Sequence, residues 1–565
     1  MNLKEHPPTI RALIEQAVAQ SPEAIAQTFR RGAEWVSCSY RDLYDRILLV
    51  AGATSELDVQ PKRDRVALML ENGPQWQEIY LAHAGAGVAV VPLDPKLQLA
   101  EVVHILQDSQ SAVVYLAAKL KELLLNALPK LPHLRHVVLV GGDSTNHGHQ
   151  EQGCPFWNYE LLIERAAQAV ATTRDWFTGN IPAAGDVASI LYTSGTTGQP
   201  KGAMLSHANF CANVESTIQT IPFNKNDNFF VILPLFHAYS FTANFMVPLR
   251  LGARMSFAQS IRSVSEDLQA LCPTVLMAVP LMAEKMYAKI MPRIKRSFMA
   301  RLLLLLRLKR IVLRKVIAGM GGKIRFFGVG GAPCPMDIFI GFRKIGFPIV
   351  EGYGITECAP GVVYGTLHDY TPGYVGRLIP GMTMRLKDPD EHGVGELQVK
   401  GPNVMLGYFN NPEMTAEAFD DGWFRTGDLC AIDKKGFIAI RGRKKALIVN
   451  REGKNIYPEE VEQAIALHPL VADVVVLGYH AKNETSGERI GVIVTPELDA
   501  IKAAANGTEP PWADIEQTLR QAVLTQSATL AEFKRPRKII VQRESLQRTS
   551  TQKVRRVIYE GTLDE

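Results

Sequence analysis

The sequence predicts an α/β protein with a large N-terminal part built from βαβ units, a β subdomain, and a compact α+β part at the C-terminus. Up to about residue 440, short β-branched runs alternate with longer amphipathic stretches, which is the pattern of a mainly parallel sheet. From about 385 to 440 the runs are shorter and are separated by glycine turns, as is typical of antiparallel strands. After about 445 the sequence again mixes helical and strand patterns.

The expected elements follow from these patterns in chain order. Apolar β-branched runs predict strands, and the amphipathic stretch 101–110 predicts a helix between two of them. A polar, glycine-rich surface loop is expected at 141–153, and an acidic helix start is expected at 458–462. The expected strands are 66–70, 89–91, 113–115, 136–140, 187–191, 324–327 and 473–477.

Composition excludes several classes of protein. Of the 565 residues, 47% are hydrophobic and 21% are charged, which favours a globular chain with a large core over a disordered one. The formal net charge of +5 argues against a dedicated nucleic-acid binder. No run approaches the length of a membrane-spanning helix, and the first ten residues contain no apolar segment, so we expect neither a spanning helix nor a signal peptide.

The seven cysteines are scattered and form no CxxC pair. This spacing argues against a disulfide framework and against a zinc site, and it fits the reducing environment of the cytoplasm. We therefore expect a cytoplasmic protein.

The most informative stretch is 192–202, YTSGTTGQPKG, which follows the strand expected at 187–191. Its three glycines let the backbone approach an anion, and its four Ser or Thr hydroxyls add hydrogen-bond donors. Lys201 adds a mobile positive charge that suits phosphate. The stretch is not a Walker A loop, because Pro200 stands where that motif requires glycine. We expect a phosphate-binding loop rather than an ordinary polar turn.

Two further motifs fit the same chemistry. EGYGITE, at 351–357, places an aromatic ring between glycines, and such a ring can stack on a purine. Its Thr-Glu pair can serve a phosphate and Mg²⁺, because a hard cation prefers carboxylate oxygen. WFRTGDL, at 423–429, contains one carboxylate that can accept two hydrogen bonds from a vicinal diol.

Together these motifs resemble those of the adenylate-forming superfamily, which contains acyl-CoA synthetases, luciferase and peptide-synthetase adenylation domains. The resemblance covers nearly the whole chain. It implies that Lys201 is catalytic, and that Tyr353 stacks on adenine, Thr356 contacts the α-phosphate and Glu357 holds Mg²⁺. It also places the turn GVGGAP, at 328–333, against the adenine and the acyl group. The nucleotide-binding residues that it implies here are Thr193, Ser194, Gly195, Thr196, Thr197, Gly198, Gly331, Ala332, Pro333, Glu351, Gly352, Tyr353 and Gly354.

By the same resemblance, Asp428 grips the ribose hydroxyls, Arg443 reaches ATP and Lys445 is the pivot of a mobile small domain. Ala446 stands where the family usually has an acid or a small polar residue, so the charge partners of the pivot differ here. The domain boundaries expected on this basis are 1–440 for the large adenylate-forming domain with the ATP and acyl sites, 441–446 for the hinge and 447–565 for the small domain.

Three more positions take their roles from the resemblance. Gly453 and Lys454 belong to the loop beside the thiol tunnel. Lys553, in LQRTSTQKVRR at 546–556, matches the catalytic lysine, although the family more often has Pro and Gly where this sequence has Gln547 and Gln552. His237, in LPLFH, matches the residue that gates the acid pocket and is counted with the catalytic residues Lys553, Lys201 and Thr356.

The resemblance implies an AMP-forming acyl-CoA synthetase that uses ATP, Mg²⁺ and coenzyme A. The stretch 240–246 contains no acid that could hold a substrate ammonium, which favours a carboxylic acid without an α-amino group, and we expect a medium- or long-chain fatty acid. Two alternatives remain: transfer of the acyl group to an acyl carrier protein, and a binding module that has lost catalysis.

One segment is strongly basic. Residues 291–315 contain nine Lys or Arg residues, no acid and five successive leucines. A helix can carry five successive leucines only by showing some of them on every face. The segment is therefore either a solvated helix whose leucines pack on the large domain, or a surface that contacts an anionic membrane. On the second interpretation, the protein is peripheral on the inner face of the membrane.

Overall fold

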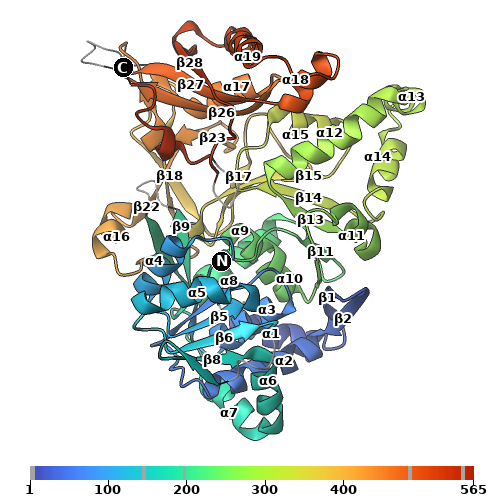
Figure 1. The fold of residues 1–565 in the computed structure, drawn as a ribbon. Helices are drawn as coiled ribbons and strands as arrows, with labels where there is room; N and C mark the ends of the chain where they lie inside the picture. Colours follow the sequence, from blue (N-terminus) through green and yellow to red (C-terminus); the bar gives the residue numbers. More distant parts are fainter. Residues whose placement is uncertain are drawn as a thin grey trace. The chain divides into compact units, whose positions relative to one another are not determined.

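The computed structural model describes residues 7–142, 148–194, 199–452, 454–480, 487–548 and 554–564 (Figure 1). The chain divides into two compact units. The first comprises Met1–Thr383 and Lys400–Phe424, and the second comprises Met384–Val399 and Arg425–Glu565. In the described part of the chain, no helix is both long enough and apolar enough to cross a membrane.

The first unit contains two nine-stranded sheets. Sheet A has the order β17-β16-β15-β14-β13-β11-β12-β1-β2. Its strands from β15 to β1 in this order are parallel, and β2, β16 and β17 are antiparallel additions at its edges. The strands are β1 Ile25–Arg31, β2 Glu34–Ser39, β11 Asn228–Val231, β12 Arg254–Phe257, β13 Val275–Ala278, β14 Phe326–Gly330, β15 Ile349–Gly354, β16 Gly361–Tyr364 and β17 Arg377–Leu378.

Sheet B has the order β20-β10-β9-β4-β3-β5-β6-β8-β7. Its centre is parallel, whereas β10, β20 and β7 pair antiparallel. The strands are β3 Arg65–Met69, β4 Ala89–Pro92, β5 Val113–Ala117, β6 His136–Val140, β7 His149–Glu151, β8 Cys154–Asn158, β9 Val187–Ser194, β10 Pro200–Ser206 and β20 Gly407–Tyr408.

Helices connect the parallel strands, as right-handed βαβ crossovers require. In the first unit they are α1 Ile10–Gln20, α2 Tyr40–Ser55, α3 Pro74–Gly85, α4 Leu99–Ser109, α5 Lys121–Ala127, α6 Tyr159–Gln168, α7 Val170–Gly179, α8 His207–Thr220, α9 Ala238–Ser240, a π-helix Phe241–Met246, α10 Val247–Leu251, α11 Val264–Leu271, α12 Pro280–Arg296, α13 Phe298–Leu305, α14 Lys309–Ala318, α15 Met336–Lys344 and α16 Pro412–Ala418, with the short strand β21 Phe419–Asp420 after them.

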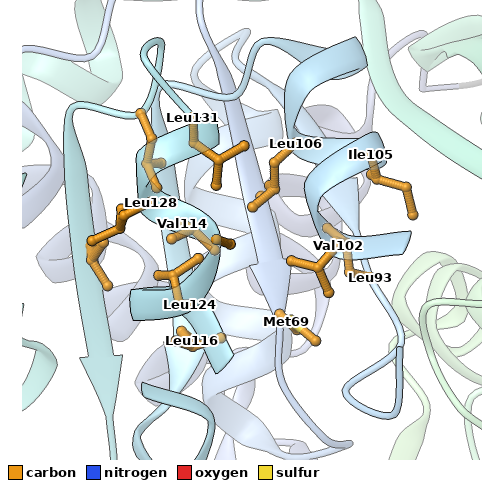
Figure 2. Packing of buried hydrophobic residues seen from close by; sticks show 14 of the residues in the cluster. Met69, Leu93, Val102, Ile105, Leu106, Val114, Leu116, Leu124, Leu128 and Leu131 are labelled. Carbon is orange, nitrogen blue, oxygen red and sulfur yellow. The ribbon is translucent and has the colours of Figure 1, made fainter. Parts of the chain in front are cut away.

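Helix α4 shows how the sequence specifies a helix in this unit. Gln98 and Glu101 form a capping box that satisfies backbone donors at its start. Val102, Ile105 and Leu106 then lie on one face and are buried against sheet B. Figure 2 shows these side chains packed with residues of α5 and of the strands below, including Leu124 and Val114.

The second unit is α+β. Strands β18 Thr383–Lys387, β19 Gly395–Lys400 and β22 Trp423–Ile432 lie side by side, and β23 Ile438–Arg443 pairs antiparallel with β22. A three-stranded sheet with the order β26-β27-β28 packs against α17 and α19. The remaining elements are β24 Ile448–Val449, β25 Asn455–Ile456, α17 Pro458–Ala466, β26 Val471–Tyr479, β27 Arg489–Pro496, α18 Leu498–Ala504, α19 Trp512–Ser527 and β28 Lys538–Val541.

The predicted fold class is confirmed, and each predicted strand and helix overlaps an element of the expected type. One local expectation needs correction. The stretch 141–153, predicted as a loop, contains β7, which forms a hairpin with β8. Its polar sequence, HQE, hid the strand because an edge strand with exposed side chains shows no apolar pattern. The boundaries 1–440, 441–446 and 447–565 describe a movement and stay a prediction.

Candidate active site

The candidate site lies in the first unit, at the C-terminal edge of the parallel strands of sheet A. Strands β14 and β15 run parallel with Gly330 opposite Gly352, so the segments that follow them leave the sheet side by side. These segments contain Gly331, Ala332 and Pro333 after β14, and Thr356 and Glu357 after β15. Ligands of open α/β sheets bind at this edge. Two of the predicted motifs therefore meet where a ligand is expected.

Backbone geometry explains two of the glycines. Gly331 has a φ of 84°, a left-handed conformation that glycine adopts without strain. At Gly354, an added Cβ would lie 2.3 Å from the carbonyl oxygen of Pro360, so no other residue fits without a shift of the backbone. The close approach holds the Tyr353–Glu357 segment against the next turn of the chain.

A cluster of three polar side chains joins both sheets of this unit. The Lys201 ammonium donates to the hydroxyl of Tyr408 at 2.6 Å, and that hydroxyl donates to Glu357 Oε1 at 2.8 Å. The Lys201 Nζ also lies 3.7 Å from Glu357 Oε1. Lys201 is on β10, and Glu357 follows β15. Tyr408 is on β20, where it pairs with Ala203 of β10. The structure thus brings the predicted catalytic lysine beside the predicted magnesium ligand.

The hydroxyl of Thr193 marks the start of the phosphate loop. Thr193 is the penultimate residue of strand β9, and within the described residues its buried Oγ1 has no hydrogen-bond partner. A buried hydroxyl without a protein partner requires another acceptor or donor, and a phosphate oxygen would supply one. Ser194 also belongs to β9, whereas Gly195, Thr196, Thr197 and Gly198 lie outside the described residues.

Magnesium fits this donor set through Glu357. The described residues contain no group of three or more side chains that could enclose a metal ion by themselves. Magnesium keeps several water ligands and is usually held by one or two carboxylates together with phosphate oxygens. A single partly buried carboxylate beside a lysine that is predicted to bind phosphate meets that requirement. Tyr353 and Thr356, the predicted contacts to adenine and the α-phosphate, are partly buried in the same segment.

An apolar cavity adjoins this edge of sheet A. Its wall includes Tyr239, Met277, Gly328, Val329 and Tyr364. An added Cβ at Gly328 would lie 2.5 Å from the sulfur of Met277, so only glycine lets the Met277 side chain pack against this strand. The cavity has a volume of only about 40 Å³, so in this structure it offers an apolar wall rather than room for a whole hydrocarbon chain.

Glu351 places a carboxyl group in the wall of this apolar cavity. Removal from water raises its pKa to about 7, and the hydrogen bond that its Oε1 accepts from the Cys334 N–H at 3.0 Å partly opposes the shift. Near neutral pH, a substantial fraction of Glu351 is therefore uncharged. The same hydrogen bond ties the turn after β14 to strand β15.

His237 caps the short helix α9 ahead of the π-helix Phe241–Met246. Its ring lies 4.4 Å from the ring of Phe236, centroid to centroid. Thr242 and Ala243 of the π-helix line the apolar cavity, so the acid-free stretch 240–246 does face the place where an acyl group would lie. π-Helices often mark functional positions, and His237 lies one turn before this one.

The remaining predicted site residues belong to the second unit. Asp428 and Arg443 are directly opposite in the β22–β23 ladder, and Arg443 Nε lies 2.8 Å from Asp428 Oδ1. Asp428 is buried, and its backbone N–H donates to Thr426 Oγ1. The structure therefore joins the predicted ribose ligand and the predicted ATP-contacting arginine as a cross-strand ion pair.

Lys445 is exposed in a 3₁₀ turn, Lys444–Ala446, that directly follows β23. Lys454 lies 2.6 Å from Glu452 and 4.8 Å from the ring centroid of Phe533. Gly453 and Lys553 lie outside the described residues. The roles assigned to all of these residues stay predictions.

Sequence reasoning missed two parts of the site. Tyr408 lies 207 residues beyond Lys201, in a segment without a motif of its own, and only strand pairing brings them together. The cavity wall was also missed, because its residues come from several strands and helices and are ordinary core residue types. Glu351 could be singled out from the sequence, because a carboxylate directly after two buried β-branched residues is unusual.

Comparison with known proteins identifies the class. Residues 14–409 match the family model described as AMP-binding enzyme, and residues 460–553 match the AMP-binding enzyme C-terminal domain. The chain belongs to the AMP-binding enzyme family, and the predicted resemblance is confirmed.

Among individual proteins, the chain is 29% identical over 523 residues to the long-chain-fatty-acid–CoA ligase FadD15 of Mycobacterium bovis, covering 87% of this chain and 83% of the relative. It is 26% identical to the chloroplastic long-chain-fatty-acid–[acyl-carrier-protein] ligase AEE15 of Arabidopsis thaliana, covering 86% and 75%. The crystal structure of ATP-bound MatB from Rhodopseudomonas palustris superposes with a TM-score of 0.74 at 26% identity, covering 98% of this chain and 99% of that one.

Proposed function

We propose that this chain is an AMP-forming acyl-CoA synthetase, which activates a medium- or long-chain fatty acid with ATP and transfers the acyl group to coenzyme A. The observation that carries the proposal is the Lys201–Tyr408–Glu357 cluster beside an apolar cavity. The cluster offers a cation and a metal-binding carboxylate to phosphates, and the cavity offers an apolar wall to an acyl chain. The long-chain ligases among the relatives support the same substrate class.

In the first half-reaction, the carboxylate of the fatty acid attacks the α-phosphorus of ATP and pyrophosphate departs. Negative charge spreads over the phosphoryl oxygens, so fixed cations and backbone donors lower the barrier. Lys201 supplies such a cation, and Thr193 supplies a hydroxyl. Magnesium, when bound, neutralises phosphate charge at Glu357. Lys553 is proposed to supply a further cation, and Asp428 and Arg443 to hold the nucleotide.

In the second half-reaction, a thiol attacks the acyl-adenylate and AMP departs. We propose that the C-terminal part rotates about Lys445 between the two reactions, so that Lys553 leaves and the Gly453–Lys454 loop faces the thiol. His237 is proposed to gate the acid pocket.

The acceptor is proposed to be coenzyme A, and an acyl carrier protein is the second candidate because one relative is named for that activity. A comparison of free coenzyme A with a purified acyl carrier protein, with thioester formation as the readout, distinguishes them. Faster transfer to the carrier protein would overturn the coenzyme A assignment.

The decisive experiment is a panel of carboxylic acids, from acetate to oleate plus benzoate, assayed for ATP-dependent pyrophosphate release and thioester formation. Medium- and long-chain acids should give the highest turnover. The Lys553→Ala variant should lose about 10²–10³ in the rate of adenylation, as expected when one preorganised cation is removed. It should still form thioester from a supplied acyl-adenylate. No pyrophosphate release with any acid would identify a binding module without catalysis instead.

We also propose that the segment 291–315 contacts an anionic membrane, with the protein cytoplasmic and peripheral on the inner face. The segment folds as the end of α12, helix α13 and the start of α14, and all nine of its Lys and Arg side chains are exposed. Leu303 and Leu304 pack against the core of the first unit, whereas Leu305 is 79% exposed. The five leucines thus divide between core and solvent, as their spacing predicted.

Large apolar side chains extend the exposed surface on both sides of Leu305. Phe298 is 69% exposed at the start of α13, and the other exposed members are Met299, Leu306, Leu308 and Ile311. Single exposed apolar side chains are ordinary, but six within 14 residues, in a 25-residue segment with nine cations, form the pattern of an interfacial segment. Each cation near anionic lipid contributes about 1 kcal/mol within a Debye length. The charge pattern supports an anionic bilayer rather than a neutral protein partner.

Flotation with phosphatidylglycerol vesicles tests this surface. Binding should be strong at low salt, weaker at high salt, and reduced in the triple variant Arg307→Gln, Lys309→Gln, Arg310→Gln. The matched control changes three exposed cations elsewhere in the unit, Arg63→Gln, Lys130→Gln and Arg262→Gln, and should float like the parent. Absence of flotation at low salt, or equal losses in both triple variants, would contradict the proposal.

A further inference from the structure

A polar hollow lies at the opposite edge of sheet A from the candidate active site. Its wall is formed by residues at the N-terminal ends of parallel strands, including Lys225 before β11, Arg254 at the start of β12, Cys272 before β13 and Lys323 before β14. The hollow has a volume of about 290 Å³, several times what one water molecule needs. No residue assigned to ATP, acid or thiol lies among those that line it.

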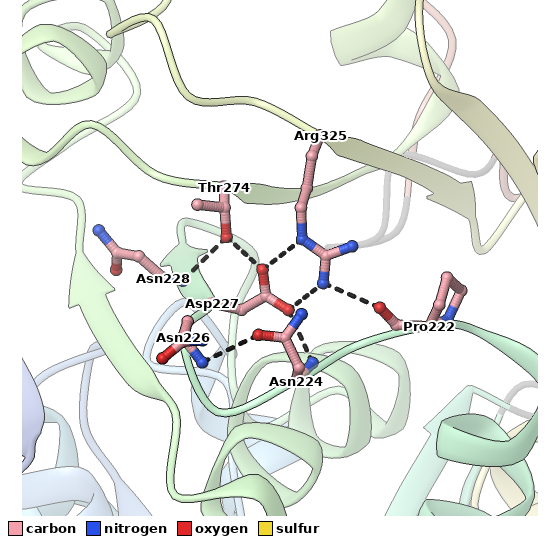
Figure 3. A network of polar contacts seen from close by, with 7 residues as sticks. All are labelled: Pro222, Asn224, Asn226, Asp227, Asn228, Thr274 and Arg325. Carbon is pink, nitrogen blue, oxygen red and sulfur yellow. Dashed lines mark hydrogen bonds and ion pairs between the residues drawn. The ribbon is translucent and has the colours of Figure 1, made fainter.

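Asp227 is the single carboxylate among the lining residues, and its charge is already neutralised. Figure 3 shows its carboxylate held between Thr274 and Arg325. Thr274 Oγ1 and Arg325 Nε each donate to Oδ1 at 2.6 Å, and a second nitrogen of Arg325 donates to Oδ2. The backbone N–H of Asn224 also donates to Oδ2, at 2.9 Å. Asp227 is therefore a structural partner of Arg325 and leaves little acceptor capacity for other cations.

Three positive charges around the hollow remain unbalanced. Lys225 and Lys323 are exposed at its rim, and Arg254 is half-buried in its wall. Within the part of the chain that the structure describes, none of these three side chains makes an ion pair, and the Nε of Arg254 is buried without an acceptor. Buried donors of folded proteins nearly always have a partner, so the unpaired Nε calls for an acceptor that the described part of the protein does not supply.

We propose that this hollow is a second binding site, specific for a phosphate group and separate from the active site. A guanidinium offers charge-assisted hydrogen bonds in a fixed geometry, and the two lysines add mobile charges that follow the anion. The satisfied Asp227 does not repel the anion as a free carboxylate would. The phosphate group belongs either to a free phosphate ion or to a phosphorylated small molecule.

Cys272 gives a local readout of occupancy, because it is half-buried and lines the hollow. The rate at which iodoacetamide alkylates each cysteine of the full chain can be followed by peptide mass spectrometry. At a phosphate concentration of about ten times the dissociation constant, alkylation of Cys272 should slow by about tenfold relative to chloride at equal ionic strength. Cys38 is also half-buried but does not line the hollow, so its rate should stay unchanged and serves as the internal control.

Variants test whether the cations cause the protection. Arg254→Gln should abolish the protection of Cys272, and the rim variant Lys225→Gln with Lys323→Gln, which changes only exposed side chains, should weaken it. Arg262→Gln, on an exposed loop after β12, should protect like the parent. Arms with inorganic phosphate, pyrophosphate and AMP distinguish a free ion from a nucleotide. Equal alkylation of Cys272 in phosphate and chloride, or protection that persists in both the Arg254 and the rim variants, would overturn the proposal.

Discussion

At the scale of single residues, Tyr408 shows how one hydroxyl can organise a charged site. It accepts a hydrogen bond from the Lys201 ammonium and donates one to Glu357, so it fixes two groups whose charges would otherwise pair directly. A pair held 3.7 Å apart leaves each partner partly available to a ligand. On the proposed mechanism, the tyrosine therefore holds the lysine and the carboxylate where phosphate and metal would bind.

Replacing Tyr408 with Phe should slow adenylation while leaving the fold intact. Loss of the bridging hydroxyl removes hydrogen bonds to two charged groups. Each such bond is worth about 1.5–3 kcal/mol, so the loss of one of them from the transition state alone predicts a decrease of about 10- to 100-fold in pyrophosphate release. The Michaelis constant for the fatty acid should change little, because the apolar cavity is untouched. Unchanged pyrophosphate release in Tyr408→Phe would remove Tyr408 from the site.

Glu351 predicts a dependence of stability on pH. Its folded pKa, about 7, lies above the ordinary value of 4.5, so between these values the folded state binds more protons than the unfolded state. Stability from this group is complete below about pH 4.5 and is lost as the pH rises to about 7, by an amount on the order of 3 kcal/mol.

The variant Glu351→Gln keeps the shape of the side chain and removes the charge. Its melting temperature should exceed that of the parent at pH 8, and the two should converge at pH 5. A parent that stays as stable as the variant at pH 8 would show that the carboxyl is hydrated rather than shielded.

At the scale of elements, helix α17 anchors the end of the chain. Arg556 lies within hydrogen-bond distance of Glu459 at 3.2 Å and of Glu462 at 2.6 Å, both on this helix, and all three side chains are mostly buried. Burial raises the pKa of Glu462, and the charge of Arg556 opposes that shift. The arginine therefore opposes the effect of burial on the Glu462 carboxylate.

Replacing Arg556 with Met should destabilise the second unit by about 2 kcal/mol. Breaking a fully buried ion pair costs more, but water still reaches these side chains. The loss should be larger at pH 8 than at pH 5, where Glu462 can take up a proton. Limited proteolysis with peptide mapping measures it. The control is Arg520→Met, which removes an exposed ion pair with Glu516 on α19 and one exposed hydrogen bond to the Ile539 carbonyl, and should cost less. Equal losses of stability in the two variants would show that the mostly buried ion pairs of Arg556 contribute no more than an exposed pair.

Elements were also what the sequence predicted best. Buried parallel strands such as β5 and β6 are nearly continuous apolar runs that contain paired valines, so their positions followed from residue type alone. The edge strand β7 did not, because its side chains face solvent. Within the site, motifs predicted the loops that meet at the edge of sheet A, but Tyr408 and the cavity wall depend on pairings between distant segments, which a single sequence does not specify.

At the scale of the whole molecule, the proposed mechanism uses two arrangements of one chain for the two half-reactions. Lys445→Pro should separate them, because proline fixes φ and removes an N–H at the proposed pivot. Adenylation should persist and transfer to coenzyme A should fail, with pyrophosphate release and thioester formation as the two measurements. Lys445→Ala keeps the backbone free and should support both reactions. Normal thioester formation by the proline variant would remove Lys445 as the pivot.

The antiparallel pairing of β10 with β20 has a consequence for biosynthesis. The ribosome completes β10 at residue 206, but β20, which carries Tyr408, begins at residue 407. At a translation rate of about 5–20 residues per second, Lys201 waits roughly 10–40 s before its partner is made. During this interval one edge of sheet B is open, and an open edge can pair with another nascent chain. The segment that completes the Lys201–Tyr408–Glu357 cluster is thus also the one that covers the open edge of β10 during synthesis.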